Sequence, residues 1–142
     1  MSLGNVREYF QNTLDPLNFR EHTDGFDFTN IPDNLLDNAY FISFGGLIGG
    51  PVNQFEQKVE VPVELRIFIK GYNSPQKAID QALVSGESII KEICKIDNRL
   101  NNNLCIKNVV FDTMEIEPLN KENDNSLILL INFDVLYMFA LK

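Results

Sequence analysis

The strictest pattern in the sequence is an alternation of apolar and polar residues over residues 59–69. The apolar positions are Val59, Val61, Val63, Leu65, Ile67 and Ile69, and the residues between them include Glu60, Glu64 and Arg66. A period of two residues predicts a β-strand with one face in the core and the other toward solvent. Pro62 lies inside the run and lacks an N–H group, so we expect a bulge or an exposed edge there.

A long amphipathic helix is predicted after this strand, over residues 75–97. Pro75 suits the first helical position, and Ser74 can cap the helix. The apolar residues that recur at helical spacing are Ala78, Ile79, Ala82, Leu83, Gly86, Ile89, Ile90 and Ile93. A short helix is expected over residues 6–14, because Asn5 can cap it and Pro16 ends it.

Three further strands are predicted over residues 39–44, 106–117 and 127–141. The last two should form a hairpin that places Phe111 opposite Phe133, Val109 opposite Val135, and Asp112 beside Asn132. The expected fold is α+β: a mixed, mainly antiparallel sheet packed against one long helix and a short N-terminal helix. We expect one domain over residues 1–142 and leave residues 1–3 out of this prediction as a potential cloning remnant.

The last predicted strand is apolar on both faces. One face carries Leu129, Ile131, Phe133, Val135, Tyr137 and Phe139, and the other carries Ile128, Leu130, Leu136, Met138 and Ala140. One long helix covers only one face of a sheet, so the second face needs either the N-terminal helix or another subunit. We favour self-association, with Leu130, Leu136 and Met138 at the subunit interface.

Glycines surround an apolar pair in the segment over residues 45–51, which we predict to be a loop. Its glycine spacing is not that of a nucleotide-binding loop, and no Lys-Ser or Lys-Thr pair follows. Two interpretations remain open: a permissive connection between strands, or a contact loop for a partner protein that uses Leu47, Ile48, Val52 and Phe55.

Residues that could carry catalysis or bind a metal ion are sparse. His22 is the only histidine, so a catalytic triad or a multi-histidine metal site cannot be built within one chain. Asp112 and Asp134 interrupt apolar strands, and we expect each to find a hydrogen-bond partner or to face solvent. We therefore predict a protein that is not an enzyme and has no catalytic residues, no metal site and no cofactor.

The charge balance disfavours nucleic acid as a partner. Twenty Asp and Glu against twelve Lys and Arg give a net charge of −8, and the cations are scattered singly. The acidic residues Glu115, Glu117, Glu122 and Asp124 surround the last hairpin. Cys94 and Cys105 form no CxxC pair, and no apolar run reaches the ~18 residues of a membrane helix. We expect a cytoplasmic protein with reduced thiols and no membrane partner.

The order of these elements resembles the tail-terminator or tail-completion proteins of long-tailed bacteriophages. The segments that carry the resemblance are Val6-Arg7-Glu8-Tyr9-Phe10, residues 19–22 and 26–32, residues 61–71, the helix from Pro75, and the closing hairpin. They span most of the chain in order and length, and none is an active-site motif.

The resemblance implies a structural phage or prophage protein. Members of that family form hexameric rings that cap the tail tube and present their opposite surface to the head-tail connector. The expected partners are thus further copies of the chain, the tail tube protein and the connector protein, and the expected location is the virion tail, with the host cytoplasm during assembly. The four acidic residues of the hairpin would line the lumen or rim of such a ring. The alternatives are a head-tail connector or neck protein and a small-molecule-binding host domain.

Overall fold

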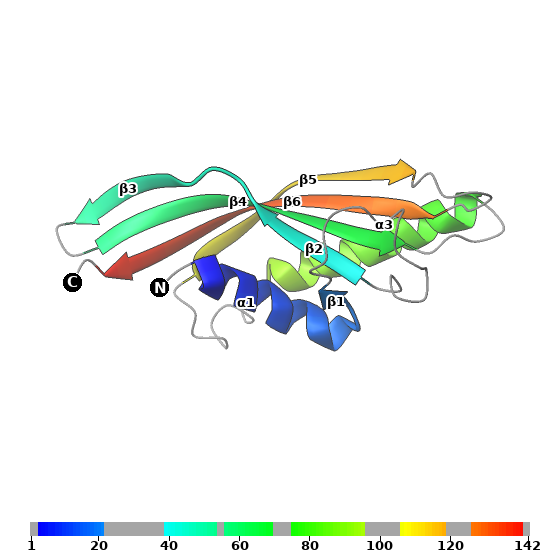
Figure 1. Cartoon of the computed structure of the whole chain (residues 1–142), viewed down its shortest axis with the longest axis horizontal. Coiled ribbons are helices and arrows are strands. Elements are labelled where there is room, and N and C mark those ends of the chain that lie inside the picture. The colour runs from blue at the N-terminus through cyan, green and yellow to red at the C-terminus, as the bar shows by residue number, and fades with distance from the viewer. Residues whose placement is uncertain are drawn as a thin grey trace.

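A sheet of six strands organises the chain, and two helices cover one of its faces (Figure 1). The structure is a computed structural model that describes residues 3–21, 39–53, 56–69, 75–95, 106–118 and 126–140. The elements are α1 (Leu3–Leu14), η1 (Asp15–Leu17), β1 (Arg20–Glu21), β2 (Ala39–Phe44), β3 (Ile48–Asn53), β4 (Glu56–Ile69), α3 (Pro75–Ile93), β5 (Ile106–Pro118) and β6 (Leu127–Ala140). The α+β fold predicted from the sequence is confirmed.

The central strands β4 and β6 form the backbone of the sheet. They are antiparallel and paired without a register break from Glu56 opposite Ala140 to Ile69 opposite Leu127. The sheet order is β1-β2-β4-β6-β5, and β3 pairs with the same side of β4 as β2 does, farther along that strand. Every pairing is antiparallel except the short parallel pair of β1 with β2. The mixed, mainly antiparallel sheet is therefore confirmed.

The alternation of apolar and polar residues that predicted β4 matches the alternating burial of its side chains. The residues predicted to face the core are buried in β4, and the odd-numbered residues of β6 that pair with them are buried too: Leu129, Ile131, Phe133, Val135 and Tyr137. Opposed residues of an antiparallel pair project to the same face, so these two strands together form one continuous apolar surface. This surface is the floor of the main core.

Both helices pack on that same surface. α3 buries Ala78, Ala82, Gly86, Ile89 and Ile93, which are five of the eight residues that the helical spacing indicated; Ile90 is half-buried, and Ile79 and Leu83 are exposed. A Cβ atom added to Gly86 would lie 2.4 Å from Met114 Sδ and 3.3 Å from Leu129 Cδ2, so the helix approaches β5 and β6 closely there.

The shorter helix α1 joins the same core. Its buried residues are Val6, Tyr9, Phe10 and Leu14, and the rings of Phe10 and Phe133 lie 5.6 Å apart. The hydroxyl of Tyr9 donates a hydrogen bond of 2.5 Å to the carbonyl oxygen of Ile93 at the end of α3. α1 therefore packs on the face that α3 already covers, and it does not cover the second face.

The irregularity expected at Pro62 lies in the neighbouring strand. Phe44 pairs with Val63 and Ile48 pairs with Glu60, so the three residues 45–47 lie opposite the two residues 61–62. The Gly45 N–H donates to the carbonyl oxygen of Pro62 at 2.8 Å. Since the N–H and C=O of a strand residue point to the same side, the missing donor of Pro62 faces this bulge, and pairing with β6 continues unbroken.

Strand β5 contains two register shifts that the sequence analysis did not anticipate. Val109 pairs with Val135 and Phe111 with Phe133, as predicted, but the register breaks between residues 106 and 108 and again between residues 111 and 113. The extra residues are Lys107 and Asp112. As a result the residues of β5 on the helix-covered face are spaced three and two apart: Ile106, Val109, Phe111, Met114 and Ile116.

One end of the sheet extends beyond both helices. It consists of β3 and the parts of β4 and β6 that lie beside it, and we call it the β-arm, residues 47–53, 56–60 and 136–140 (Figure 1). The arrowhead end of β5 and the N-terminal half of α3 lie at the opposite end of the long axis (Figure 1). The molecule is thus elongated and has two different ends.

Candidate functional site

The sheet face without helices is the first candidate assembly surface. On β6 it carries Ile128, Leu130, Asn132, Asp134, Leu136 and Met138. Of the three predicted interface residues, Leu136 and Met138 are half-buried, whereas Leu130 is only 7% exposed within the single chain. Asp134 is exposed, and it lies beside Pro62 and Val110. The open part of this face is therefore centred on residues 134–138 of β6.

A small second core explains why Leu130 is buried. At the end of the sheet where β2 begins, Ala39, Phe41 and Phe68 form a separate buried cluster with Ile128 packed against it. Phe41 and Leu130 both pair with Arg66, so Leu130 lies beside this cluster. The second face is thus buried at the end where this cluster lies and open toward the β-arm. For that reason Leu130 is buried within the chain, whereas Leu136 and Met138 can contact a partner.

The predicted contact loop is mostly a strand. The segment over residues 45–51 was predicted to be a loop, but the loop ends at Leu47, and Ile48–Asn53 form β3 against β4. Ile48 and Val52 therefore lie in an edge strand, and Phe55 lies outside the described residues. Glycines and a proline signal turns when read alone, whereas here pairing with a long neighbour holds them extended. Leu47, at 52% exposed, remains available for contact.

The acidic residues of the hairpin are described only in part. Glu115 and Glu117 are exposed on β5, opposite Leu130 and Ile128, and so belong to the face without helices. Glu122 and Asp124 lie outside the described residues, as does His22. An acidic rim at this end of the sheet stays a prediction.

The predicted register, in which Asp112 is the residue opposite Asn132, is wrong at this position. Asp112 is the extra residue of the second bulge, and Thr113 takes its place opposite Asn132. The amide of Asn132 donates a hydrogen bond of 2.9 Å to Thr113 Oγ1. Asp112 and Asp134 are both exposed, so their carboxylates are hydrated by solvent. This was the second of the two outcomes expected for them.

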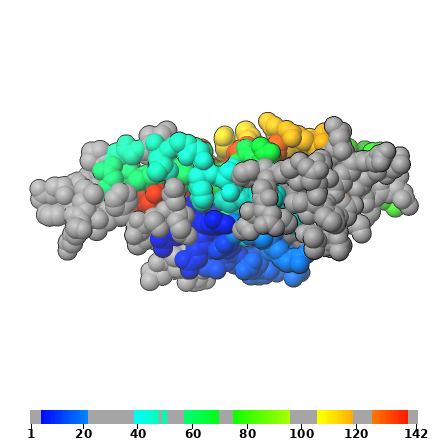
Figure 2. Space-filling model, in the orientation of Figure 1, coloured from blue at the N-terminus to red at the C-terminus, as the bar shows by residue number. Residues whose placement is uncertain are grey.

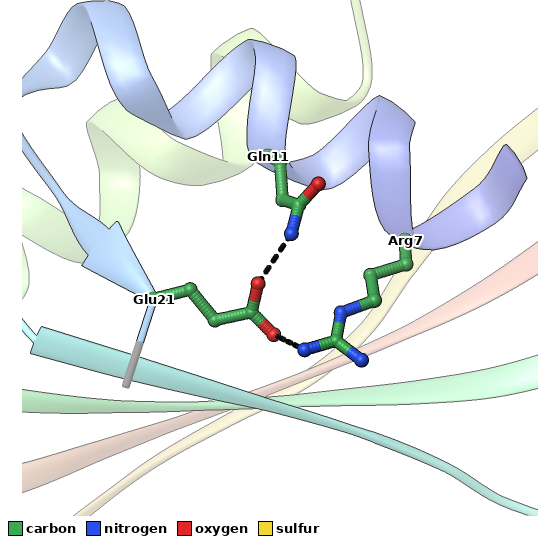
Figure 3. Close-up of polar contacts among 3 residues, drawn as sticks. All are labelled: Arg7, Gln11 and Glu21. Carbon is green, nitrogen blue, oxygen red and sulfur yellow. Dashed lines mark hydrogen bonds and ion pairs between the residues drawn. The ribbon is translucent and has the colours of Figure 1, made fainter. Parts of the chain in front are cut away.

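A polar cluster of Arg7, Gln11 and Glu21, which we call the latch, joins α1 to β1 and was missed by the sequence analysis. The Glu21 carboxylate accepts one hydrogen bond from the Arg7 guanidinium and another from the Gln11 amide, which lie one helical turn apart (Figure 3). Because β1 pairs with β2, the latch fixes α1 to the edge of the sheet. The i, i+4 spacing of Arg7 and Gln11 is visible in the sequence, but their common partner fourteen residues away from Arg7 is not.

Among the described residues, the hydroxyl oxygen of Tyr40 is the one buried side-chain nitrogen or oxygen atom without a hydrogen-bond partner. Burial raises the pKa of Tyr40 above its ordinary value, and the carboxylates of Glu21 and Asp15 raise it further, whereas Arg7 acts in the opposite direction. A phenol that is held neutral beside the latch is a poor acid or base at ordinary pH, so it does not suggest catalysis.

Exposed apolar side chains on α3 and β5 were also missed by the sequence analysis. Ile79, Leu83 and Val84 lie on the N-terminal half of α3, at the end of the molecule opposite the β-arm, whereas Val110 and Phe111 lie at the middle of β5, opposite Asp134 and Phe133 (Figure 1). Ile79 and Leu83 share a helix flank with Gly86, whose close approach to Met114 places that flank above β5. We call the open side of β5 over residues 113–118, with Ile79 and Leu83, the β5 seam.

Other features of the described residues point to no ligand. No group of three or more His, Cys, Asp or Glu side chains among them could hold a metal ion. A shallow depression on the outer side of α3 is lined by Lys77, Asp80, Gln81 and Val84. None of the described helices is both long enough and apolar enough to cross a membrane.

Comparison with known proteins adds no relative. The sequence matches no protein-family model and shows no significant similarity to a curated protein.

Proposed function

We propose that this chain is a structural phage or prophage protein, a tail terminator that forms a ring, caps the tail tube and docks to the head-tail connector. The observation that carries the proposal is the unequal cover of the two sheet faces. Both helices lie on one face, and the other leaves Leu136 and Met138 half-exposed. Apolar surface of this kind, rimmed by charged residues, is typical of contact with another protein.

The distribution of the exposed apolar residues supports contact between copies. They lie on different parts of the molecule: Leu47 at the base of the β-arm, Val110 and Phe111 at the middle of β5, and Ile79 and Leu83 at the end opposite the β-arm (Figure 1). A surface that meets its own equivalent needs only one patch, whereas a head-to-tail contact needs two different ones. Head-to-tail contacts close into a ring when the rotation between neighbours divides a full turn.

The charge of the open face supports a passage for DNA through the ring. Glu60, Asp134, Glu115 and Glu117 are exposed there, against the exposed cation Lys58. Glu64 on the same face forms an ion pair of 2.6 Å with Arg66. A predominantly acidic wall repels the phosphate backbone, which suits a conduit that DNA must traverse without binding.

Two rival functions remain, each with its own discriminating result. A head-tail connector or neck protein would also form a ring, but it would sit on the head side of the joint. A small-molecule-binding host domain would stay a monomer or a small oligomer and would be absent from virions. The self-association therefore separates the first two functions from the third, and the location in the virion separates the first from the second.

The experiment has two stages. Light scattering coupled to gel filtration measures the mass of the purified chain, and negative-stain electron microscopy shows whether the particles are rings with a central opening. Antibody labelling of the phage or induced prophage particles then locates the protein. The proposal predicts a ring of about six copies at the head-proximal end of the tail. A label on the head vertex of tailless particles would favour the connector.

A further inference from the structure

The two ends of the molecule carry complementary features. At one end, β3 is the outer strand of the β-arm, and its coloured atoms lie at the surface in the view of Figure 2. At the other end, β5 is the outer strand, and among the described strands it pairs with β6 alone. Unpaired strand edges present backbone N–H and C=O groups that can add a strand from another chain.

Only part of β5 is suited to such pairing. The two bulges at Lys107 and Asp112 break the first half of the strand, and bulges with charged residues are a common way to block edge pairing. Residues 113–118 follow without a further register break. β3 also has six residues, of which residues 48–51 pair with β4 before the register shifts between Pro51 and Asn53. The regular half of β5 is therefore the part that can pair with the regular part of β3.

Charge on the two edges is opposite. Lys58 lies opposite Gly50, and its side chain runs over that glycine, since a Cβ atom there would lie 3.3 Å from Lys58 Cε. Lys58 thus reaches toward the outer edge of β3 on the face without helices. Glu115 and Glu117 lie on the same face of β5, so a sheet that continues from one copy into the next would bring the ammonium beside the two carboxylates.

Apolar residues complete the match on the other face. Ile79 and Leu83, which are 36% and 46% exposed, lie on the helix flank that continues from Gly86, the residue of α3 that approaches Met114 of β5. Gly49 of β3 lies opposite Val59 and so faces the helix side of the sheet, where it presents no side chain that would collide with them. Leu47, just before β3, supplies an exposed apolar side chain at the same edge.

We propose that the β-arm of one copy docks at the β5 seam of the next, with β3 alongside residues 113–118 and Lys58 beside Glu115 and Glu117. The contact is head-to-tail, because the two surfaces differ and lie at opposite ends of the long axis (Figure 1). It rests on the proposed ring and names the surfaces that join its subunits. Each copy then contributes the edge of β3 and accepts it at residues 113–118 of β5, so these two edges are paired in a closed ring.

Cysteine cross-linking tests this contact directly. The background is Cys94→Ala with Cys105→Ser, which removes the native thiols, and the pair added to it is Gly50→Cys with Glu115→Cys. Mild oxidation should give a ladder of covalent multimers on non-reducing electrophoresis, because every copy carries both halves of the contact. Each single variant should remain monomeric on the same gel.

The contradicting outcomes are distinct. A covalent dimer from Glu115→Cys alone would mean that β5 pairs with β5 of a partner, and this result would overturn the head-to-tail contact. A ring in solution with no cross-link from the pair would overturn the inference while the proposed function stands. A monomer in solution would overturn both.

A charge exchange gives a second readout that does not depend on the cysteines. Lys58→Glu should weaken association at low salt, and Glu115→Lys with Glu117→Lys should weaken it as well. The triple variant should recover association to within about threefold of the wild type, because the charges are opposite again. If the triple variant associates no better than Lys58→Glu alone, these charges do not meet and the inference fails.

Discussion

The two faces of β6 carry similar residues but have different surroundings. On one face, Leu129, Ile131, Phe133 and Val135 are completely buried under α1 and α3. On the other, Leu136 and Met138 are half-buried and Asp134 is in solvent. The difference shows that the apolar character of a strand does not determine its burial, because burial depends on what the rest of the chain supplies to cover it. Here both helices go to the same face.

Deletion of Asp112 tests what the second bulge of β5 contributes. Without the extra residue, Thr113 follows Phe111 directly, the alternation becomes regular, and Met114 and Ile116 stay opposite Ile131 and Leu129 on the helix-covered face. The core contacts are kept, so the free energy of unfolding should change by about 1 kcal/mol or less. Urea unfolding followed by circular dichroism measures the change.

The matched control for this deletion is Asp112→Asn. It keeps the bulge and changes only an exposed side chain, so the free energy of unfolding should stay within about 0.5 kcal/mol of the wild type. Equal loss in the deletion and in the substitution would mean that the carboxylate, and not the extra residue, matters at this position.

A truncation on each face of β6 compares them directly. Phe133→Ala removes a ring that is buried against Phe10 and Phe111 and should cost about 3–5 kcal/mol. Leu136→Ala, on the open face, should cost the monomer about 1 kcal/mol or less and should instead weaken association. Urea unfolding at low and high protein concentration separates these effects. A loss at Leu136 as large as at Phe133, independent of concentration, would contradict the comparison.

Two tyrosines on the covered face should respond oppositely to loss of their hydroxyls. Tyr9→Phe removes the hydrogen bond to Ile93 and should destabilise by about 1 kcal/mol, whereas Tyr40→Phe removes an unpartnered hydroxyl and should be neutral or stabilising by about 1 kcal/mol. Thermal unfolding at neutral pH measures both. Destabilisation by Tyr40→Phe similar to that by Tyr9→Phe would show that the Tyr40 hydroxyl has a partner.

The raised pKa of Tyr40 also predicts a pH dependence. The folded chain holds this proton more tightly than the unfolded chain, so the stabilisation is complete below the ordinary tyrosine pKa of 10.0 and is lost as pH rises above it. Wild-type stability should therefore fall between about pH 10 and 12, and Tyr40→Phe should reduce that fall. An identical alkaline profile for the two proteins would contradict the assignment to Tyr40.

The smallest effect is the one expected for DNA. The open face has more exposed carboxylates than cations, and the whole chain carries a net charge of −8. Fluorescence anisotropy with a labelled duplex should show no measurable binding at physiological salt. Tight binding that weakens as salt increases would contradict the conduit and favour a role in nucleic-acid binding.

Much of this fold was predictable from the sequence because its long elements have unambiguous periods. Ala39–Phe44 was predicted with its observed bounds, and β4, α3 and β6 begin within three residues of their predicted starts. The pairing of Phe111 with Phe133 followed from matching the apolar residues of two strands. These predictions succeeded where the local pattern and the tertiary pairing agree.

The failures came where pairing overrides local preference. Ile48–Asn53 contains two glycines and a proline, which indicate a turn, yet it pairs with β4 along its length. The bulges of β5 depend on how residues 106–118 fit beneath α3, and a single strand does not reveal that fit. The assembly surfaces were predicted in part, since Leu136 and Met138 are open whereas Leu130 is covered within the chain, and the β5 seam was missed because it needs α3 and β5 side by side.

Self-association is the central claim of this account, and sedimentation velocity over a hundredfold range of protein concentration tests it most directly. The open face, the two different ends and the unpaired edges of the described strands predict a discrete oligomer in equilibrium with the monomer at the lowest concentrations, and the proposed tail-terminator function puts its mass at about six times that of the monomer. A single monomeric species at every concentration, in a chain whose circular dichroism confirms that it is folded, would contradict the account.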